Sequence, residues 1–168
     1  MIPTLETERL RLRAFREADL DAYAEMCADP EVMQYLGTGK TFTRGESWRS
    51  IAGFLGHWQL RGYGMWALEE KATGTLVGRA GFLHPPDWPD FEIGWTLGRP
   101  YWGRGFALEA SRRALDHAWR ELRRERVVSL IRPANAPSIR VAEKLGARRV
   151  GPIDMLGSVA DLYEHARP

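Results

Sequence analysis

The 168-residue sequence predicts an α/β fold whose elements follow in the order βααβββαβαββ. Short stretches that alternate apolar and polar residues predict strands, because strand side chains point to the two faces in turn. Longer runs with apolar residues every three or four positions predict helices, most clearly from residue 107 to residue 122. A turn with two glycines joins a predicted strand directly to that helix.

One strand and two helices are predicted for the first third of the chain. Arg9–Phe15 alternates apolar and charged residues, which is typical of a half-buried strand. Glu17–Ala28 predicts a short helix that stops before Pro30, because proline disfavours helix at the preceding residue. A second helix is expected to begin at Thr43–Glu46, where hydroxyl and carboxylate can form a capping box, and to end near Gly62.

Three strands are predicted next. Gly64–Glu69 and Thr75–Leu83 form a hairpin in this prediction. A proline-rich loop then leads into a strand at Phe91–Leu97. Its alternation separates two sets of residues on opposite faces, Phe91, Ile93, Trp95 and Leu97 on one and Glu92, Gly94 and Thr96 on the other.

The last third is expected to hold two helices and three strands. The amphipathic helix from residue 107 is followed by a buried strand at Val127–Ile131. Pro137, favoured at a first helical position, and Gly146, favoured just after a helix, delimit a short second helix. The two closing strands are expected at Arg148–Val150 and Leu162–Ala166.

The turn Trp102-Gly103-Arg104-Gly105-Phe106-Ala107 has the properties of an anion-binding site. Glycine lets the backbone approach a ligand closely because no Cβ intervenes. The start of the following helix supplies unpaired N–H groups and a partial positive charge, which together favour phosphate. The turn lacks the GxxxxGK[ST] of a P-loop and the full GxGxxG of a dinucleotide fold, so ATP and NAD are poor candidates.

Composition and charge predict a single globular domain over residues 1–168. Hydrophobic residues make up 44% and charged residues 27% of the chain, which argues against disorder. The net charge is +2, and the 24 cations, 21 of them arginine, are interspersed with 22 acids. Because no basic block stands apart from acidic neighbours, a nucleic-acid partner is disfavoured.

The protein is expected to be cytoplasmic. Cys27 is the single cysteine, so no disulfide can form within the chain, which fits a reducing compartment. Residues 1–10 do not resemble a signal peptide, and no apolar stretch approaches the length of a membrane span. Neither a membrane partner nor a metal site is predicted.

Arg99–Ala110 resembles the acyl-CoA pyrophosphate loop of the GNAT N-acetyltransferases, usually written Q/R-x-x-G-x-G/A. Gly105 and Ala107 take the small-residue places, and Trp102 stands in the first place, as in the ribosomal-protein (RimJ/RimL-like) branch. Asn135–Ala147 resembles a second GNAT segment, N-x-x-S/A-x-x-x-Y/A-E-K-x-G-F, with alanine in place of the terminal aromatic residue. Together with the element order, the resemblance covers essentially the whole chain.

This resemblance implies the GNAT fold, with a mixed, mostly antiparallel central sheet of about seven strands and four helices. It implies an acetyl-CoA-dependent N-acetyltransferase that moves the acetyl group from the thioester to a primary amine within a ternary complex. The acceptor would be a protein N-terminal α-amine or a small amine that enters along Met33–Phe42. A non-catalytic acyl-CoA-binding sensor or interaction module is the alternative, and a homodimer stays open.

Two residues are expected to carry the chemistry that the resemblance implies. Glu92 is the candidate general base, because its strand leads directly to the glycine turn; the alternative is a structural hydrogen-bond partner. Ser138 is the candidate that returns a proton to the sulfur of CoA. Other side chains considered for these two roles are the carboxylates Asp154 and Asp161 and the hydroxyls of Tyr101 and Tyr163.

Two segments are expected to bind acetyl-CoA. Backbone N–H groups around Leu97 and Gly98 are placed to stabilise the oxyanion of the reaction. Asn135 and Ser138 would face the pantetheine and the thioester, although both residue types also serve as helix caps. The residues expected to contact CoA are Leu97, Gly98, Trp102, Gly103, Arg104, Gly105, Phe106, Ala107, Asn135, Ser138 and Arg140.

Overall fold

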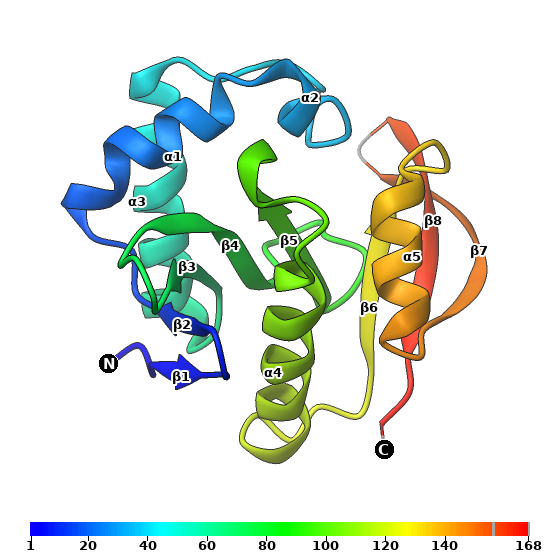
Figure 1. The fold of residues 1–168 in the computed structure, drawn as a ribbon. Coiled ribbons are helices and arrows are strands. Elements are labelled where there is room, and N and C mark those ends of the chain that lie inside the picture. The colour runs from blue at the N-terminus through cyan, green and yellow to red at the C-terminus, as the bar shows by residue number, and fades with distance from the viewer. Residues whose placement is uncertain (156, 168) are drawn as a thin grey trace.

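Eight strands form one sheet in the order β1-β2-β3-β4-β5-β6-β8-β7 (Figure 1). The computed structural model describes residues 1–155 and 157–167. Strands β5 and β6 pair in parallel, and the other neighbours pair antiparallel. The strands are β1 (Leu5–Glu6), β2 (Leu10–Arg13), β3 (Met65–Glu70), β4 (Leu76–Leu83), β5 (Glu92–Leu97), β6 (Val127–Ile131), β7 (Arg148–Met155) and β8 (Ser158–His165).

Helices cover both faces of this sheet. They are α1 (Leu20–Cys27), α2 (Pro30–Met33), α3 (Arg44–Arg61), α4 (Phe106–Arg120) and α5 (Ala136–Lys144), with 3₁₀ turns at Glu17–Asp19 and Arg99–Tyr101. Along β3, Trp66 and Leu68 share a core with α4, whereas Ala67 between them packs with α1 and α3. Because successive strand residues point to opposite faces, α4 lies on one side of the sheet and α1 and α3 on the other. Across the described residues, none of the helices has the length and apolar character that a membrane span requires.

The long helix α3 begins and ends where the sequence predicts. The hydroxyl of Thr43 accepts the Glu46 N–H at 3.2 Å, and the Glu46 carboxylate accepts the Thr43 N–H at 2.7 Å. These two hydrogen bonds complete the capping box. Gly62 follows the last turn with φ of 75°, a left-handed conformation that glycine adopts at little cost.

Helix α4 lies close against the sheet because its buried face is built from small residues. Ala110, Ala114 and Ala118 are all 0% exposed. At its start, Phe106 is buried between the guanidinium groups of Arg9 and Arg104, which lie 4.7 and 4.5 Å from the ring centroid. This packing fixes the first turn of α4 beside the carboxyl end of β5 (Figure 1).

The structure has one strand and one helix more than the sequence predicts. The additional strand, β1, has two residues, too few to show a period of two. The additional helix, α2, begins at Pro30 because the Asp29 carboxylate accepts the Glu31 N–H at 2.9 Å and caps it. Pro30 was expected only to end the preceding helix. In the structure α1 does end before Pro30, and Pro30 is also the first residue of α2.

The hairpin at the end of the chain is longer than the predicted strands. The expected strands Arg148–Val150 and Leu162–Ala166 correspond to β7, which runs on to residue 155, and to β8, which begins at residue 158. Gly151 and Pro152 interrupt the pattern of β7, and the register shifts there. Proline is tolerated because β7 is the edge strand of the sheet.

Strands β5 and β6 diverge along their length. The register pairs them at Glu92 and Val128, near the start of both strands. Beyond this point β5 continues toward the glycine turn while β6 leads into α5 (Figure 1). Side chains take over some of the hydrogen bonds that the two strands would otherwise exchange: the Ile93 carbonyl accepts from the Ser129 hydroxyl and the Leu97 carbonyl from the Trp102 indole.

Candidate active site

Two pockets meet where β5 and β6 diverge. The larger, of 570 Å³, lies along the start of α4 and the side of α5, and is here called the α4 groove. The smaller, of 380 Å³, extends over the face of β5 that carries Glu92, and is here called the β5 pocket. The residues that line both are Tyr35, Leu36, Trp95, Thr96, Asn135 and Ser138.

The glycine turn forms one wall of the α4 groove. Gly103 and Gly105 have φ of 73° and 82°, values that a residue with a side chain rarely adopts. Gly105 is the N-cap residue of α4, and Phe106, Ala107 and Leu108 of the first turn also line the groove. The first N–H groups of a helix have no partner within the helix. The groove therefore offers backbone donors and a helix N-terminus to an anion.

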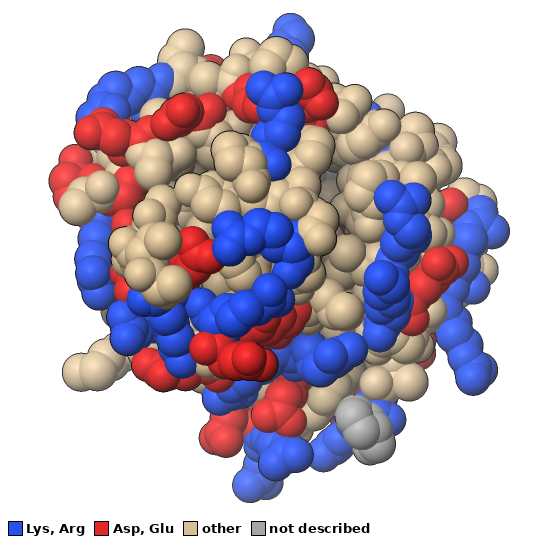
Figure 2. All heavy atoms as spheres, viewed as in Figure 1, with Lys and Arg blue, Asp and Glu red and all other residues tan. Residues whose placement is uncertain are grey.

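Most of the residues predicted to contact CoA lie together in the α4 groove. They are Leu97, Trp102, Gly103, Gly105, Phe106, Ala107, Asn135, Ser138 and Arg140. The basic residues Arg140 and Lys144 of α5 flank it, and Figure 2 shows a hollow in the surface between the α4 and α5 regions. Over the rest of the face in Figure 2, acidic and basic side chains are interspersed.

Two of the residues predicted to contact CoA lie elsewhere. Gly98 packs against Tyr101, and its N–H donates to the Val77 carbonyl at 3.0 Å. It is therefore engaged in the β4–β5 ladder and is not free to donate to an oxyanion. The Arg104 guanidinium turns away from the groove, because it forms an ion pair with Glu70 and lies over the Phe106 ring.

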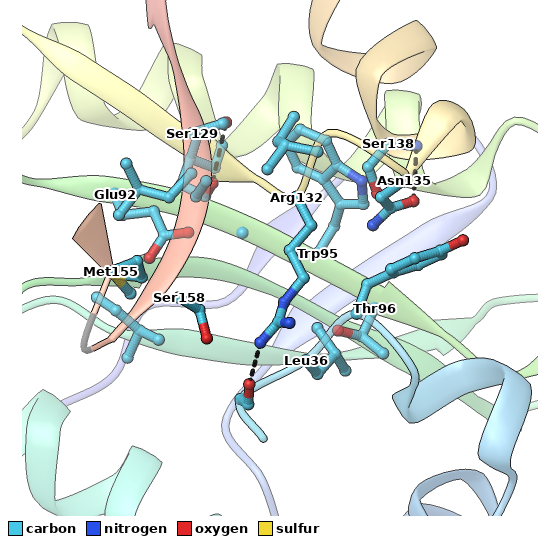
Figure 3. A pocket seen from close by; sticks show the side chains of 18 of the residues that line it. Leu36, Glu92, Trp95, Thr96, Ser129, Arg132, Asn135, Ser138, Met155 and Ser158 are labelled. Atoms are coloured by element: carbon cyan, nitrogen blue, oxygen red, sulfur yellow. Dashed lines mark hydrogen bonds between the residues drawn. The ribbon is translucent and has the colours of Figure 1, made fainter. Parts of the chain in front are cut away.

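Glu92 lies in the β5 pocket with a strongly perturbed carboxyl group (Figure 3). Burial raises its pKa from 4.5 to about 7. Hydrogen bonds from the Trp88 indole, at 2.7 Å, and from the Leu130 N–H oppose this rise in pKa, as does the charge of Arg79. Near neutral pH the carboxyl group is therefore divided between its protonated and ionised states.

Asn135 caps α5, as the simplest interpretation of this residue predicts. Its side-chain oxygen accepts the Ser138 N–H at 3.3 Å (Figure 3). Ser138 uses only its backbone in this cap. Its side chain lies at the junction of the α4 groove and the β5 pocket.

The cap predicts different stability effects for two neighbouring substitutions. Asn135→Ala should lower the free energy of unfolding by about 1 kcal/mol, because the N–H at the start of α5 loses its partner. Ser138→Ala should leave the free energy of unfolding nearly unchanged, because the capping donor is the backbone. Urea denaturation of both variants measures the difference, and equal destabilisation would show that the Ser138 hydroxyl also supports the helix.

The other side chains considered for catalysis lie outside both pockets. Asp154 accepts the Gly157 N–H at 2.8 Å, and Asp161 pairs with Arg149 at 2.6 Å, which lowers the pKa of Asp161. Tyr101 packs against the main core, and Tyr163 is buried in the small core beneath α5. Glu92 is the one carboxylate among the described residues that line the β5 pocket.

Several polar residues of the β5 pocket were not singled out from the sequence. Arg132 crosses the pocket and donates to the Gly37 carbonyl (Figure 3). Ser129 donates to the Ile93 carbonyl at 3.1 Å and lies 2.8 Å from His165 Nε2, whose pKa is lowered by burial to about 4. Arg79 lies on β4. These residues lie on segments that are far apart in the sequence. No single segment therefore shows a pattern that would predict this pocket.

No three His, Cys, Asp or Glu side chains gather in a metal-binding arrangement within residues 1–155 and 157–167.

The fold is that of a GNAT acetyltransferase. The model of the family described as "Acetyltransferase (GNAT) domain" matches residues 9–148, and the chain therefore belongs to the GNAT family of N-acetyltransferases. The α/β fold expected from the sequence is confirmed, with eight strands instead of seven and five helices instead of four.

Individual relatives agree with this assignment. The chain is 32% identical over 150 residues to an uncharacterized N-acetyltransferase, p20, of Bacillus licheniformis, covering 88% of this chain and 84% of p20. The crystal structure of an acetyltransferase from Agrobacterium tumefaciens str. C58 is 31% identical, with a TM-score of 0.89 over 99% of this chain and 96% of that one. The ribosomal L7/L12 α-N-protein acetyltransferase RimL, solved with coenzyme A, shares the fold at 20% identity, with a TM-score of 0.81 over 98% of each chain.

Proposed function

We propose that this protein transfers the acetyl group of acetyl-CoA to a primary amine by direct attack within a ternary complex. One observation carries the proposal. The α4 groove and the β5 pocket are adjacent and share their lining at Trp95, Asn135 and Ser138. A thioester in the groove and an amine in the pocket would meet at this junction, and such positioning alone can supply several kcal/mol.

The α4 groove fits the pyrophosphate and pantetheine of CoA. Gly103 and Gly105 bring the backbone up to the ligand without a Cβ, and the first turn of α4 presents N–H groups. Arg140 and Lys144 add positive charge at the rim. Bound acetyl-CoA supplies an activated acetyl group on a sulfur whose thiol pKa, about 8.5, makes it a fair leaving group.

In this proposal Glu92 accepts the proton of the amine. An α-amine has a pKa of about 8, close to that of the Glu92 carboxyl at about 7, whereas a lysine-like amine lies above 10. Proton transfer to Glu92 is therefore much less unfavourable from an α-amine. This difference in pKa supports an α-amino group as the acceptor.

Backbone geometry supports an oxyanion donor at Leu97. The N–H of Gly98 points to β4, where it binds Val77. Because successive N–H groups of a strand point to opposite edges, the N–H of Leu97 points toward the divergence of β5 and β6. It would stabilise the negative charge that develops on the acetyl oxygen.

The reaction balances with these groups. The amine nitrogen forms a bond to the acetyl carbon as the carbon–sulfur bond breaks, and the electron pair leaves with sulfur. The amine proton passes to Glu92, which then releases it to solvent. The thiolate takes a proton from solvent, either directly or through the Ser138 hydroxyl, which is reprotonated by solvent. Because a thiolate leaves readily, Ser138 is expected to contribute much less to the rate than Glu92.

The acceptor that we propose is a protein N-terminal α-amine or a small α-amine. The pyrophosphate loop resembles the RimJ/RimL branch, and the named activity of RimL is α-N-acetylation of a ribosomal protein. Incubation of lysate with isotopically labelled acetyl-CoA, with and without the protein, followed by mass spectrometry, tests this. We expect labelled acetyl groups on α-amines only when the protein is present. Tight CoA binding without any labelled product would favour a non-catalytic sensor.

A further inference from the structure

The charges of the β5 pocket are unbalanced. Among the described residues that line it, the charged ones are Arg79, Arg132 and Glu92. With Glu92 ionised the pocket carries one net positive charge, and with Glu92 protonated it carries two. The carboxyl pKa of about 7 means that both states are populated near neutral pH.

Arg132 presents a guanidinium group inside the pocket without an acidic partner. It extends from the end of β6 between Trp95 and Ser158, and its bonded partner is the neutral Gly37 carbonyl (Figure 3). A carbonyl can hold the guanidinium in place without neutralising its charge. The remaining donors of its planar fork suit a carboxylate.

Arg79 is a second arginine without a carboxylate partner. It lies 5.1 Å from the Phe54 ring centroid, its Nη1 contacts the Met65 sulfur at 3.6 Å, and its buried Nε has no hydrogen-bond partner. None of the ion pairs among the described residues includes Arg79 or Arg132. By contrast, Arg13, which is buried, pairs with both Asp19 and Glu69.

The sheet register sets Arg79 and Glu92 apart along one face of the sheet, although the charge of Arg79 still acts to lower the pKa of Glu92. Arg79 lies opposite Thr96, and Glu92 lies opposite Leu83, on the same face of the sheet. The four-residue offset places the Cα atoms of Arg79 and Glu92 about 13 Å apart. Gly81 and Gly94 oppose each other between them, and Met65, which lines the pocket, packs against both.

We propose that the amine acceptor carries a carboxylate, held by Arg132 and Arg79 while the amine lies near Glu92. The proposal rests on the proposed acetyl transfer and narrows its substrate class. The apolar lining, which includes Leu36, Met65 and Trp95, suits a hydrophobic body between the two polar ends. Polycationic acceptors such as polyamines and aminoglycosides are disfavoured, because their charges would face the two arginines.

Matched acceptors test the proposal without any mutation. Amine-dependent release of CoA thiol is measured with apolar α-amino acids and with their α-amides, and with Met-Glu and Met-Gln peptide amides. Preference for the free amino acids would place the carboxylate on the α-carbon, and preference for Met-Glu would place it on an acidic side chain. We expect one of these two preferences. The kcat/KM of the carboxylate-bearing acceptor should exceed that of its amide by about tenfold or more, as for a hydrogen bond between charged groups. Equal use of the charged and uncharged partners in both pairs would overturn the proposal.

Substitutions then assign the preference to the two arginines. Arg132→Gln and Arg79→Gln should each raise KM for the carboxylate-bearing acceptor by about tenfold and leave KM for its amide nearly unchanged. Arg112→Gln, on the exposed face of α4, removes the same charge outside both pockets and should change neither. An equal rise in KM for acid and amide in both pocket variants would contradict a role in binding the carboxylate.

A binding measurement separates this inference from the proposed reaction. N-acetylated amino acids and their amides are titrated calorimetrically into the complex of the protein with CoA. Carboxylate-dependent binding that Arg132→Gln abolishes would support the anion site even if no amine were acetylated, in which case only the proposed reaction would fail. Absence of a carboxylate preference in both binding and turnover would overturn the anion site.

Discussion

Glu92→Gln is expected to lower kcat about 10²- to 10⁴-fold, the usual contribution of a general acid–base group. The amide keeps the size of the side chain and can still accept the Trp88 hydrogen bond, but it cannot take a proton from the acceptor amine. Affinity for acetyl-CoA should survive, so kcat/KM falls with kcat. Ser138→Ala is the companion variant, and its loss in kcat should be far smaller because solvent can protonate the departing thiolate.

The pH dependence distinguishes a base from a structural partner. Below pH 7 the wild-type Glu92 is mostly protonated and cannot act as a base, so the rate should rise with pH through about 7. Glu92→Gln should lose this inflection, and its deficit relative to wild type should therefore be greatest above pH 7. A wild-type pH profile in the variant would contradict the role of Glu92 as base.

The pH dependence of thermal stability tests the raised pKa of Glu92 independently of catalytic activity. Because burial raises the Glu92 pKa above its ordinary 4.5, this residue favours folding below pH 4.5 and loses that contribution as pH rises to about 7. Glutamine does not ionise, so Glu92→Gln should melt at a higher temperature than wild type above pH 7. A Tm difference between the two proteins that does not change with pH would show that the carboxyl group is not desolvated.

Gly105→Val should weaken CoA binding by roughly 100-fold or more, equivalent to about 3 kcal/mol. Valine disfavours the left-handed conformation at this position, where φ is 82°. A built Cβ would also lie 3.3 Å from the Arg9 guanidinium, and the rest of the side chain would enter the space that the glycine turn leaves for the ligand. Calorimetric titration with CoA measures the loss.

Gly62→Val is the matched control for this change. Gly62 has a similar φ of 75° and no atom within 4 Å of its Cβ position, but it ends α3 and lines neither pocket. Both variants should lose comparable stability from backbone strain, while only Gly105→Val should lose CoA affinity. Arg104→Ala should cost at most about 1 kcal/mol of affinity, because its side chain faces Glu70. Unchanged CoA binding in Gly105→Val would remove this turn from the binding site.

Elements with local signals could be predicted from the sequence. The Thr43 cap and the Gly62 stop define α3, and the alanine stripe defines α4, because each signal lies within a few residues of the element it marks. The two-residue strand β1 and the full length of β7 could not be predicted. Their pairing comes from neighbouring strands, and Gly151 and Pro152 hide the alternation in β7.

In the candidate site, too, local sequence signals could be predicted and contacts between distant residues could not. Most of the residues that line the α4 groove could be grouped from the sequence because they come from two contiguous motifs. The side-chain direction of Arg104 could not be predicted, because it depends on an ion pair with Glu70, which is distant in the sequence. Arg79 and Arg132 reach the β5 pocket from β4 and from the loop before α5, so only the three-dimensional arrangement brings them into one pocket with Glu92.

Release of CoA thiol by the purified protein tests the central claim most directly. The assay follows free thiol from acetyl-CoA with and without an α-amine acceptor, and mass spectrometry quantifies the acetylated product in the same samples. The account predicts thiol release that requires the amine, equals the amount of acetylated amine, and falls sharply in Glu92→Gln. Tight acetyl-CoA binding with no amine-dependent thiol release across peptides, amino acids and small amines would contradict it.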